Sequence, residues 1–242
     1  MTALSINCDM GEGYGSYRLA DDAAIMPWID LANIACGFHA SDPVIMYDTV
    51  RLAEKHGVRI GAHPSLPDLQ GFGRREMSVD PGDLRAMLRY QIGALVGMMA
   101  GTDARLHHIK PHGALYGMAC RSNDVADAIA DVALAYEVPV LGLAGTLQEK
   151  VYAARGVRMI AEFYADLDYN EDGTLRIVKH PVTRTVPEAA ARVRDAFDYG
   201  RTTAATGKTI PIRAETVCVH SDNPNALALV AALSQSRQET PA

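Results

Sequence analysis

Short apolar segments alternate with amphipathic segments along the whole chain. Seven short apolar segments have the length expected of buried strands. They are 4–7, 31–35, 58–62, 106–109, 138–143, 157–163 and 216–219. The segments between them repeat apolar residues every three or four positions, which is the spacing of a helix with one buried face. Strands that alternate with helices predict a parallel sheet covered by helices.

Capping residues mark where several of these helices begin and end. Asp80 is a suitable N-cap, and a second helix is expected over 43–56 with Gly57 as its C-terminal glycine. Further helices are expected at 124–136 and 224–236. The helix after Asp80 has the clearest apolar face, which consists of Leu84, Leu88, Gln91 or Ile92, Leu95 and Met99.

One segment, 164–183, is less regular than the rest of the chain. It contains "YNEDGTL", which is typical of a turn and would suit an inserted hairpin. The chain shows no internal repeat and no composition typical of a linker. A single βα domain over residues 1–242 is therefore expected.

Composition and charge narrow the classes of function. The 242 residues are 48% hydrophobic and carry a formal net charge of −6, which argues against a nucleic-acid-binding surface. There is no apolar run of the roughly 20 residues that a membrane span needs, and residues 1–7 do not resemble a signal peptide. We expect a soluble, cytoplasmic protein. Its cysteines are far apart, and Cys8, Cys36 and Cys218 are interpreted as small buried side chains.

Polar side chains gather where the expected strands end. In a closed βα barrel the carboxyl ends of the strands meet at one mouth, where catalytic groups lie, whereas in an open sheet they would line a crevice. The candidates, in chain order, are Asp9, Glu12, His39, His63, Lys110, His112, His220 and Asp222. Asn7, Asn33, Glu162, Asp166 and Glu215 occupy similar positions.

The histidines are the most informative of these residues. Imidazole is a poor cap and a poor turn residue, so four histidines after four strands indicate a site, namely His39, His63, His112 and His220. Asp42 has a simpler explanation as a helix cap before Pro43, and Asp222 is open to the same explanation. No role is assigned to His56, His107, His108 or His180, and His107 and His108 should point to opposite faces of a strand.

Two further segments suggest binding of anions. Pro111 restrains the backbone between Lys110 and His112, and their spacing would direct both side chains to one face. We hypothesise that Lys110 binds a developing oxyanion or a phosphate and that His112 moves protons. Arg74 and Arg75 follow two glycines in "GFGRR", which would suit either an anion-binding loop or an ordinary exposed loop.

Several long segments, considered together, resemble one protein family. They are "NCDMGEGYG", "ANIACGFHASDP", "GVRIGAHPSLPDLQGFGRREM", "IKPHGALYG", "YNEDGTL" and "VCVHSDNPNA", in this order. The chain resembles the family of 5-oxoprolinase A subunits, also called the LamB/YcsF family. The resemblance implies an irregular seven-stranded βα barrel of the glycoside hydrolase/deacetylase type. It also implies ATP-dependent opening of 5-oxo-L-proline to L-glutamate, with Mg²⁺, ADP and phosphate, in a complex with the B and C subunits.

The resemblance carries over to individual residues. The matching motif residues are Asp9, Glu12, His39, Asp42, His63, Lys110, His112, His220 and Asp222. Four positions depart from the family pattern: Ser41 and Ser221 replace glycine, Gly117 replaces asparagine and Leu167 replaces arginine. A serine in place of glycine is costly only where φ is positive or the backbone lies close to a ligand, while loss of an arginine affects recognition of carboxylate or phosphate.

The implied reaction needs three kinds of group. Cations would spread the charge of a transferred phosphoryl group, for which Lys110, Arg74 and Arg75 are candidates. A base must activate water, and a second histidine would protonate the ring nitrogen; the base could be Asp9, Glu12, His39, His63 or His112. One alternative is a metal-dependent hydrolase with Asp9, His39 and His63 as ligands. Another is a non-catalytic subunit that binds the lactam.

Overall fold

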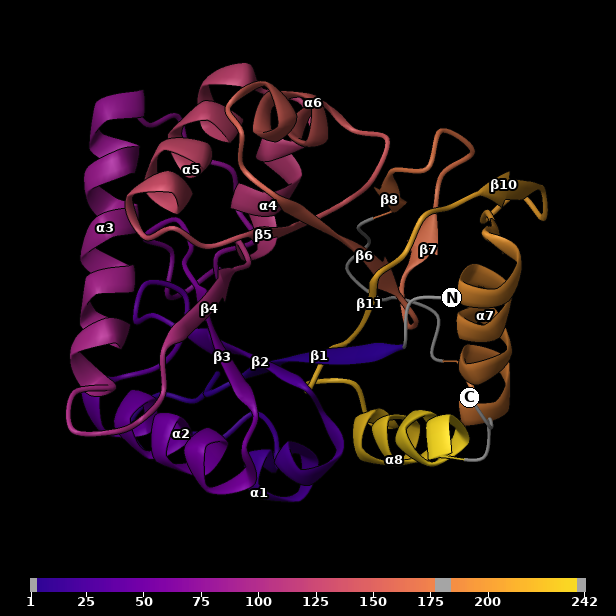
Figure 1. Ribbon diagram of the computed structural model, residues 1–242, viewed down its shortest axis with the longest axis horizontal. Helices are drawn as coiled ribbons and strands as arrows, with labels where there is room; N and C mark the ends of the chain where they lie inside the picture. The colour runs from indigo at the N-terminus through magenta and orange to yellow at the C-terminus, as the bar shows by residue number, and fades with distance from the viewer. Residues whose placement is uncertain (1–3, 177–183, 239–242) are drawn as a thin grey trace.

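A computed structural model describes residues 4–176 and 184–238, and its centre is a closed barrel of seven parallel strands (Figure 1). Around the barrel the strand order is β1-β11-β6-β5-β4-β3-β2. The strands are β1 (Ser5–Met10), β2 (Leu31–Ala35), β3 (Arg59–His63), β4 (Leu106–Ile109), β5 (Val140–Gly142), β6 (Met159–Tyr164) and β11 (Thr216–Val219). The predicted βα barrel is confirmed, and the open sheet is excluded.

The seven predicted strands are present, with some shifted ends. β2, β4 and β11 have the predicted bounds, whereas β5 is shorter. β1 extends to Met10 and β3 to His63, so Asp9 and His63 lie within strands rather than after them. Both residues therefore project from the rigid sheet, which positions a side chain more precisely than a loop does.

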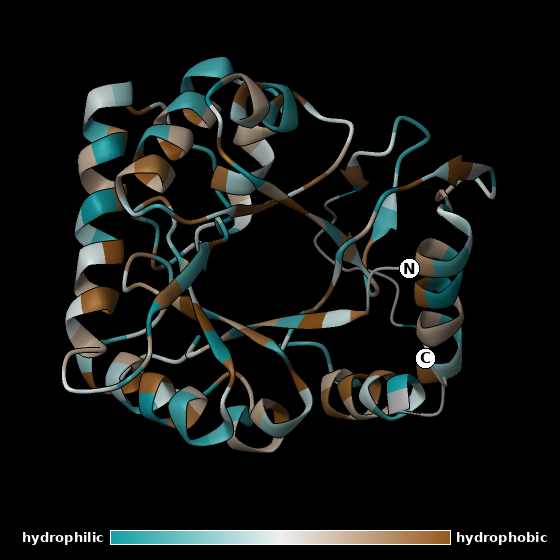
Figure 2. Ribbon diagram, viewed as in Figure 1, coloured by the Kyte–Doolittle hydropathy of each residue, from teal (hydrophilic) through white to brown (hydrophobic). Residues whose placement is uncertain are grey.

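The helices surround the barrel, with α2, α3 and α5 on successive sides (Figure 1). The main helices are α2 (Pro43–His56), α3 (Pro81–Met98), α4 (Gly113–Ala119), α5 (Asn123–Ala135), α6 (Leu147–Ala154), α7 (Val186–Tyr199) and α8 (Ala226–Gln238). The short segments α1 (Asp22–Ile25) and η1 (Met26–Trp28) precede β2. Apolar and polar positions alternate along α3 and α5 (Figure 2). In the described chain, none of the helices combines the length and apolar character that spanning a membrane requires.

The predicted caps are present. Asp80 accepts a hydrogen bond from the Gly82 amide at 2.7 Å, and Gly57 ends α2 with a φ of 66°. Asp42 caps α2 by accepting hydrogen bonds from the amides of Val44 and Ile45. The predicted apolar face of α3 is buried, comprising Leu84, Leu88, Gln91, Ile92, Leu95 and Met99. Gln91 ties the loop after β3 to α3, because it both donates to and accepts from the Ser65 backbone.

Two antiparallel hairpins lie outside the barrel. The predicted one pairs β7 (Asp168–Tyr169) with β8 (Leu175–Arg176). The second, β9 (Arg201–Thr203) with β10 (Thr209–Pro211), was not predicted. The last helix begins at Ala226 rather than 224. His180, to which no role is assigned from the sequence, lies outside the described residues.

Much of the barrel interior is polar. Asn33 pairs in register with Asp9 on one side and with Gly61 on the other, and Gly61 pairs with His108. A Cβ atom on Gly61 would lie 2.0 Å from His108 Nε2, so the glycine makes room for the imidazole. A small apolar cluster inside the barrel consists of Leu31, Leu141 and Ile160. Branched apolar residues usually fill such barrels, and the buried polar layer therefore needs a functional explanation.

Candidate active site

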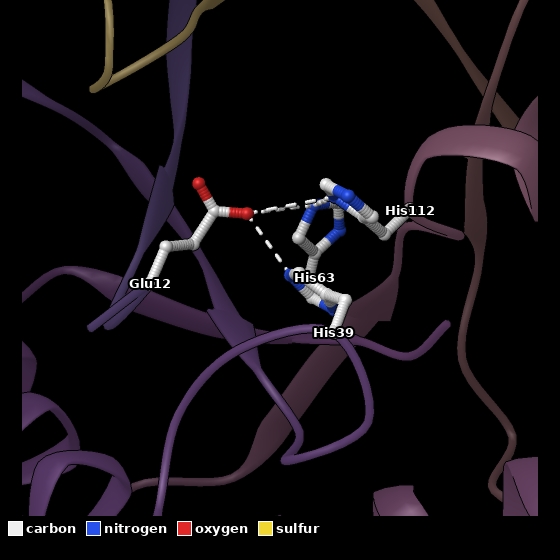
Figure 3. Close-up of side chains that lie close together, drawn as sticks. All are labelled: Glu12, His39, His63 and His112. Carbon is white, nitrogen blue, oxygen red and sulfur yellow. Dashed lines mark hydrogen bonds and ion pairs between the residues drawn. The ribbon is translucent and has the colours of Figure 1, made fainter. Parts of the chain in front are cut away.

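Three histidines and one glutamate converge at the carboxyl ends of β1 to β4 (Figure 3). Glu12 Oε1 lies 3.0 Å from His39 Nε2, 3.5 Å from His112 Nδ1 and 3.9 Å from His63 Nε2. The rings of His39 and His112 are stacked, with centroids 3.7 Å apart, and both are edge-on to His63. All four side chains are buried. We call Glu12, His39, His63 and His112 the histidine cluster.

Backbone carbonyls determine the orientation of two of these rings. His63 Nδ1 lies 2.7 Å from the Lys110 carbonyl oxygen, and His112 Nε2 lies 2.8 Å from that of Phe72. A carbonyl oxygen can only accept, so each of these nitrogens must carry a proton and donate it. The remaining nitrogens, His63 Nε2 and His112 Nδ1, face each other at 2.9 Å. In the neutral rings both are lone-pair acceptors.

The loop after β3 has a strained backbone that supports the cluster. Phe72, which supplies the carbonyl to His112, has a φ of 54°, a conformation that is uncommon for residues other than glycine. The next residue, Gly73, has a φ of 63° and packs under the cluster. A Cβ atom there would lie 2.2 Å from Ser65 Oγ and 2.8 Å from both His39 and His112. Strain of this kind is concentrated at functional sites.

The four departures from the family pattern have different structural settings. Ser41 has a φ of 76° and is buried, so this serine does occupy a position that favours glycine. Ser221 does not have a positive φ. Its buried Oγ has no hydrogen-bond partner among the described residues. Gly117 lies within α4. Leu167 packs against the core, and its carbonyl accepts a hydrogen bond from Arg192.

A buried lysine lies beside the histidine cluster. Lys110 Nζ is 2.8 Å from Asp9 Oδ1 and 3.1 Å from Glu162 Oε1, and it donates to Cys218 Sγ at 3.0 Å. The Lys110 side chain is 2% exposed. Burial opposes the charged form, but the neighbouring acids, chiefly Asp9, outweigh it and raise the pKa of Lys110 well above its usual value. Because Lys110 already neutralises two carboxylates, the geometry does not favour the hypothesised direct contact with a phosphate.

The two oxygens of Asp9 have different surroundings. Oδ1 accepts hydrogen bonds from Asn33 Nδ2 and Lys110 Nζ. Oδ2 faces His63 Nε2 at 3.3 Å and His220 Nε2 at 3.9 Å. Burial alone would raise the pKa of Asp9, but its positively charged neighbours, including the Lys110 ammonium, outweigh it and hold that pKa well below its usual value. Asp9 is therefore an ionised carboxylate with one oxygen fixed and the other directed at two imidazoles.

His220 completes the mouth on the side of β11. Its Nδ1 lies 3.0 Å from both oxygens of Asp166, and its ring stacks on that of Tyr164. Burial alone would lower the pKa of His220, but the Asp166 carboxylate outweighs it and raises that pKa to about 9. His220 therefore carries a proton at neutral pH. Its side chain is 21% exposed, unlike those of the histidine cluster.

The two arginines predicted to bind a cofactor occupy different positions. Arg74 lies on the rim, where its guanidinium is 3.1 Å from Asp222 Oδ2 and 5.0 Å from the centre of the Phe72 ring. Asp222 therefore pairs with Arg74 across the mouth. The helix that Asp222 was considered to cap, α8, begins only at Ala226. Arg75 instead pairs with the buried carboxylate of Asp68 and so holds the loop together. Of the two, Arg74 lies against the mouth.

Within residues 4–176 and 184–238, two groups of side chains have the composition of metal ligands. One is the histidine cluster, and the other contains Asp9, Cys218 and His220; within each group the ligand atoms lie within 4.8 Å of one another. The set hypothesised from the sequence, Asp9 with His39 and His63, is brought together only in part: Asp9 Oδ2 lies 3.3 Å from His63 Nε2, but Asp9 also belongs to the second group. The first group contains four suitable donors without it.

A cavity of about 430 Å³ adjoins the cluster. Glu12, Ser221 and Arg18 are among the residues that line it.

Several residues of the site were not among those predicted. Asn33 joins Asp9 to His108, whose Nε2 lies 2.7 Å from Asn33 Oδ1. His108 was assigned no role from the sequence, but it is fully buried in this network. Glu162 and Asp166 are strand-end residues outside the predicted candidate set. For Glu162 the sequence carries a signal, since a carboxylate inside an apolar strand is costly to bury unless it has a partner.

Comparisons with known proteins find relatives along nearly the whole chain. A model of the LamB/YcsF family matches residues 4–241. The lactam utilization protein lamB of Emericella nidulans is 43% identical over 229 residues, which cover 93% of this chain and 90% of that protein. The A subunit of 5-oxoprolinase from Vibrio parahaemolyticus is 43% identical over 238 residues, covering 96% and 95%. The crystal structure of a lactam utilization protein from Thermus thermophilus has a TM-score of 0.91 and 38% identity, covering 98% and 96%.

Proposed function

The chain belongs to the LamB/YcsF family, and we propose that it is the A subunit of an ATP-dependent 5-oxoprolinase. In this proposal it acts in the cytoplasm with the B and C subunits and opens the lactam ring of 5-oxo-L-proline to L-glutamate. ATP with Mg²⁺ is consumed, and ADP and phosphate are released. The names of the relatives support the substrate class.

The observation that carries the proposal is an acid and a base at one mouth. Asp9 is ionised and His220 is protonated, and Asp9 Oδ2 lies 3.9 Å from His220 Nε2. Hydrolysis of an amide needs both functions, because water must lose a proton and the leaving nitrogen must gain one. Pairs of titratable groups whose pKa values are moved apart are typical of such sites.

The proposed chemistry begins with activation of the amide. Transfer of the γ-phosphoryl group of ATP to the lactam oxygen makes the carbonyl carbon more electrophilic. Asp9 Oδ2 then accepts a proton from water, whose oxygen attacks that carbon. The C–N bond breaks as His220 gives its proton to the ring nitrogen, and an acyl phosphate remains. A second water hydrolyses the acyl phosphate to glutamate and phosphate.

The remaining candidate residues have supporting roles in this proposal. Lys110 positions Asp9 and keeps it ionised, rather than contacting phosphate. Arg74 is the proposed phosphate contact, since it lies on the exposed rim, and Arg75 positions the loop that carries Arg74 through its pairing with Asp68.

The test is formation of glutamate from 5-oxoproline and MgATP by the chain with the B and C subunits. Asp9→Asn and His220→Asn should each lower the rate by about 10²–10⁴-fold, while His56→Gln at the end of α2 serves as a matched control and should leave it unchanged. Circular dichroism would confirm that the variants fold. Full activity of Asp9→Asn, together with loss of activity when the chain is omitted, would contradict this role and support the non-catalytic, lactam-binding subunit.

The histidine cluster favours one second candidate, a metal-dependent hydrolase that needs no ATP. Its donors are those of hydrolytic metal sites, three imidazoles and a carboxylate. This candidate predicts that the isolated chain opens 5-oxoproline or a related cyclic amide without nucleotide. The 5-oxoprolinase proposal predicts that glutamate forms only when ATP is present.

A further inference from the structure

We propose that Glu12, His39, His63 and His112 bind one divalent transition-metal ion, with Zn²⁺ as the best match, and that Asp9 lies outside the ligand set. The site would sit beside the acid and base of the proposed ring opening. Its existence can be measured without any turnover.

The spacing of the donor atoms suits a four-coordinate ion. Zn–N bonds of about 2.0–2.1 Å place tetrahedral ligand atoms about 3.3 Å apart. The shortest separation in the cluster, His63 Nε2 to His112 Nδ1, is 2.9 Å. The three distances from Glu12 Oε1 are 3.0, 3.5 and 3.9 Å. These values bracket the tetrahedral spacing, so small side-chain movements would complete the coordination.

The carbonyl partners orient the donors as metal ligands need. In metal sites, a ligating histidine donates its second ring N–H to a carbonyl or carboxylate, which fixes the tautomer and aims the lone pair. His63 and His112 both do this, toward the carbonyls of Lys110 and Phe72. The Phe72 carbonyl is presented by a backbone with positive φ. The structure therefore maintains a strained residue whose carbonyl holds a donor nitrogen in place.

Among the described residues, no lysine or arginine is paired with the carboxylate of the histidine cluster. Two lone pairs, those of His63 Nε2 and His112 Nδ1, face each other in a buried setting. In the described part of the chain, the ion-pair partners of Glu12 are all histidines. A divalent ion would satisfy the lone pairs and the carboxylate together.

The second group already contains a cation. The Lys110 ammonium lies against Asp9 and Cys218, and His220 is held by Asp166. A metal ion there would have to displace the lysine, whereas the histidine cluster contains no lysine or arginine. Imidazole with carboxylate, and no thiolate, favours a borderline ion such as Zn²⁺ over Cu(I).

The test uses the untagged full chain, because a histidine tag would bind metal by itself. Mass spectrometry would measure metal per chain after purification without added metal, and again after chelation and dialysis against Zn²⁺ or Co²⁺. We expect about one ion per chain in the wild type. In Glu12→Gln and His112→Gln we expect a loss of affinity of about 100-fold or more, since even loss of an outer-shell partner costs about 10–100-fold. Asp9→Asn and the control His56→Gln should retain the ion.

The outcomes are decisive in either direction. A wild-type chain that takes up no Zn²⁺ or Co²⁺ overturns the proposal, as does metal lost in Asp9→Asn but retained in Glu12→Gln. If the ligand variants fail to fold, the Co²⁺ spectrum of the wild type decides between the groups. A sulfur-to-cobalt charge-transfer band would place the ion at Cys218 and refute the assignment to the histidine cluster. Stoichiometric cobalt without such a band would support that assignment. A chain that binds the ion yet opens no 5-oxoproline would contradict the proposed function alone.

Discussion

Replacing Lys110 with methionine would leave two buried carboxylates, those of Asp9 and Glu162, without their shared cation. The side chains of both acids are at most 4% exposed, so water cannot replace the ammonium. At an effective dielectric constant of about 20, each contact near 3 Å corresponds to about 5–6 kcal/mol before desolvation is counted. Removing one partner from a buried ion pair costs about 3–5 kcal/mol in practice.

We therefore expect Lys110→Met to lower the free energy of unfolding by about 3–5 kcal/mol at pH 7. For a chain of this size that corresponds to a fall in Tm of about 6–20 °C. The penalty should shrink as pH falls from 8 to 5, because protonation of one carboxyl removes the uncompensated charge. The Lys110→Met/Glu162→Gln double variant should recover part of the loss for the same reason.

Urea denaturation followed by circular dichroism at several pH values would measure these differences. Lys208→Met is a matched control, because Lys208 forms an exposed pair with Glu171 and exposed pairs are worth only about 0–1 kcal/mol. A Lys110→Met penalty no larger than that of Lys208→Met, or one independent of pH, would refute the assignment of Lys110 as a buried counter-ion.

Three further predictions follow from individual contacts. Ser41→Gly should raise stability by about 0.5–1 kcal/mol, because relief of the left-handed strain exceeds the entropic cost of glycine; a lower Tm would contradict this. Gly61→Ala should cost about 1–3 kcal/mol through overpacking against His108, so an unchanged urea midpoint would count against the packing. The pKa of His220 is raised in the folded state to about 9. Protonated His220 therefore contributes at most about 3 kcal/mol to the free energy of unfolding. This contribution is fully present below pH 6.5 and is lost as pH rises through 9. His220→Asn should flatten the fall in stability between pH 7 and 9.5, and an unaltered profile would show that the pairing with Asp166 contributes nothing.

Local patterns were sufficient to predict much of the fold. β2, β4 and β11 match their predicted bounds because each is a short apolar run between turn signals. Gly57 and Asp80 end and begin helices as predicted, because capping depends on a few neighbouring backbone groups. α4, α6, α7 and the β9–β10 hairpin were not predicted individually. Of these, α4, α6 and the hairpin are short elements that carry weak periodic signals.

The membership of the site was more predictable than its pairings. His39, His63 and His112 meet because they lie at or after the carboxyl ends of neighbouring parallel strands, which the order of strands along the chain already implied. Which acid pairs with Lys110 and which with the histidines depends on register between strands, such as that of Asp9 with Asn33. Glu162 is on β6, far from Lys110 in sequence, so only the closed barrel reveals their contact.

The central claim is that Asp9 and His220 face a lactam bound at the mouth of the barrel. A crystal structure of the chain soaked with 5-oxoproline tests it most directly. The account predicts the ring at the mouth, with its carbonyl carbon nearest Asp9 Oδ2 and its nitrogen nearest His220. Clear density for 5-oxoproline at a different place on the molecule, with Asp9 and His220 out of contact with it, would contradict the account.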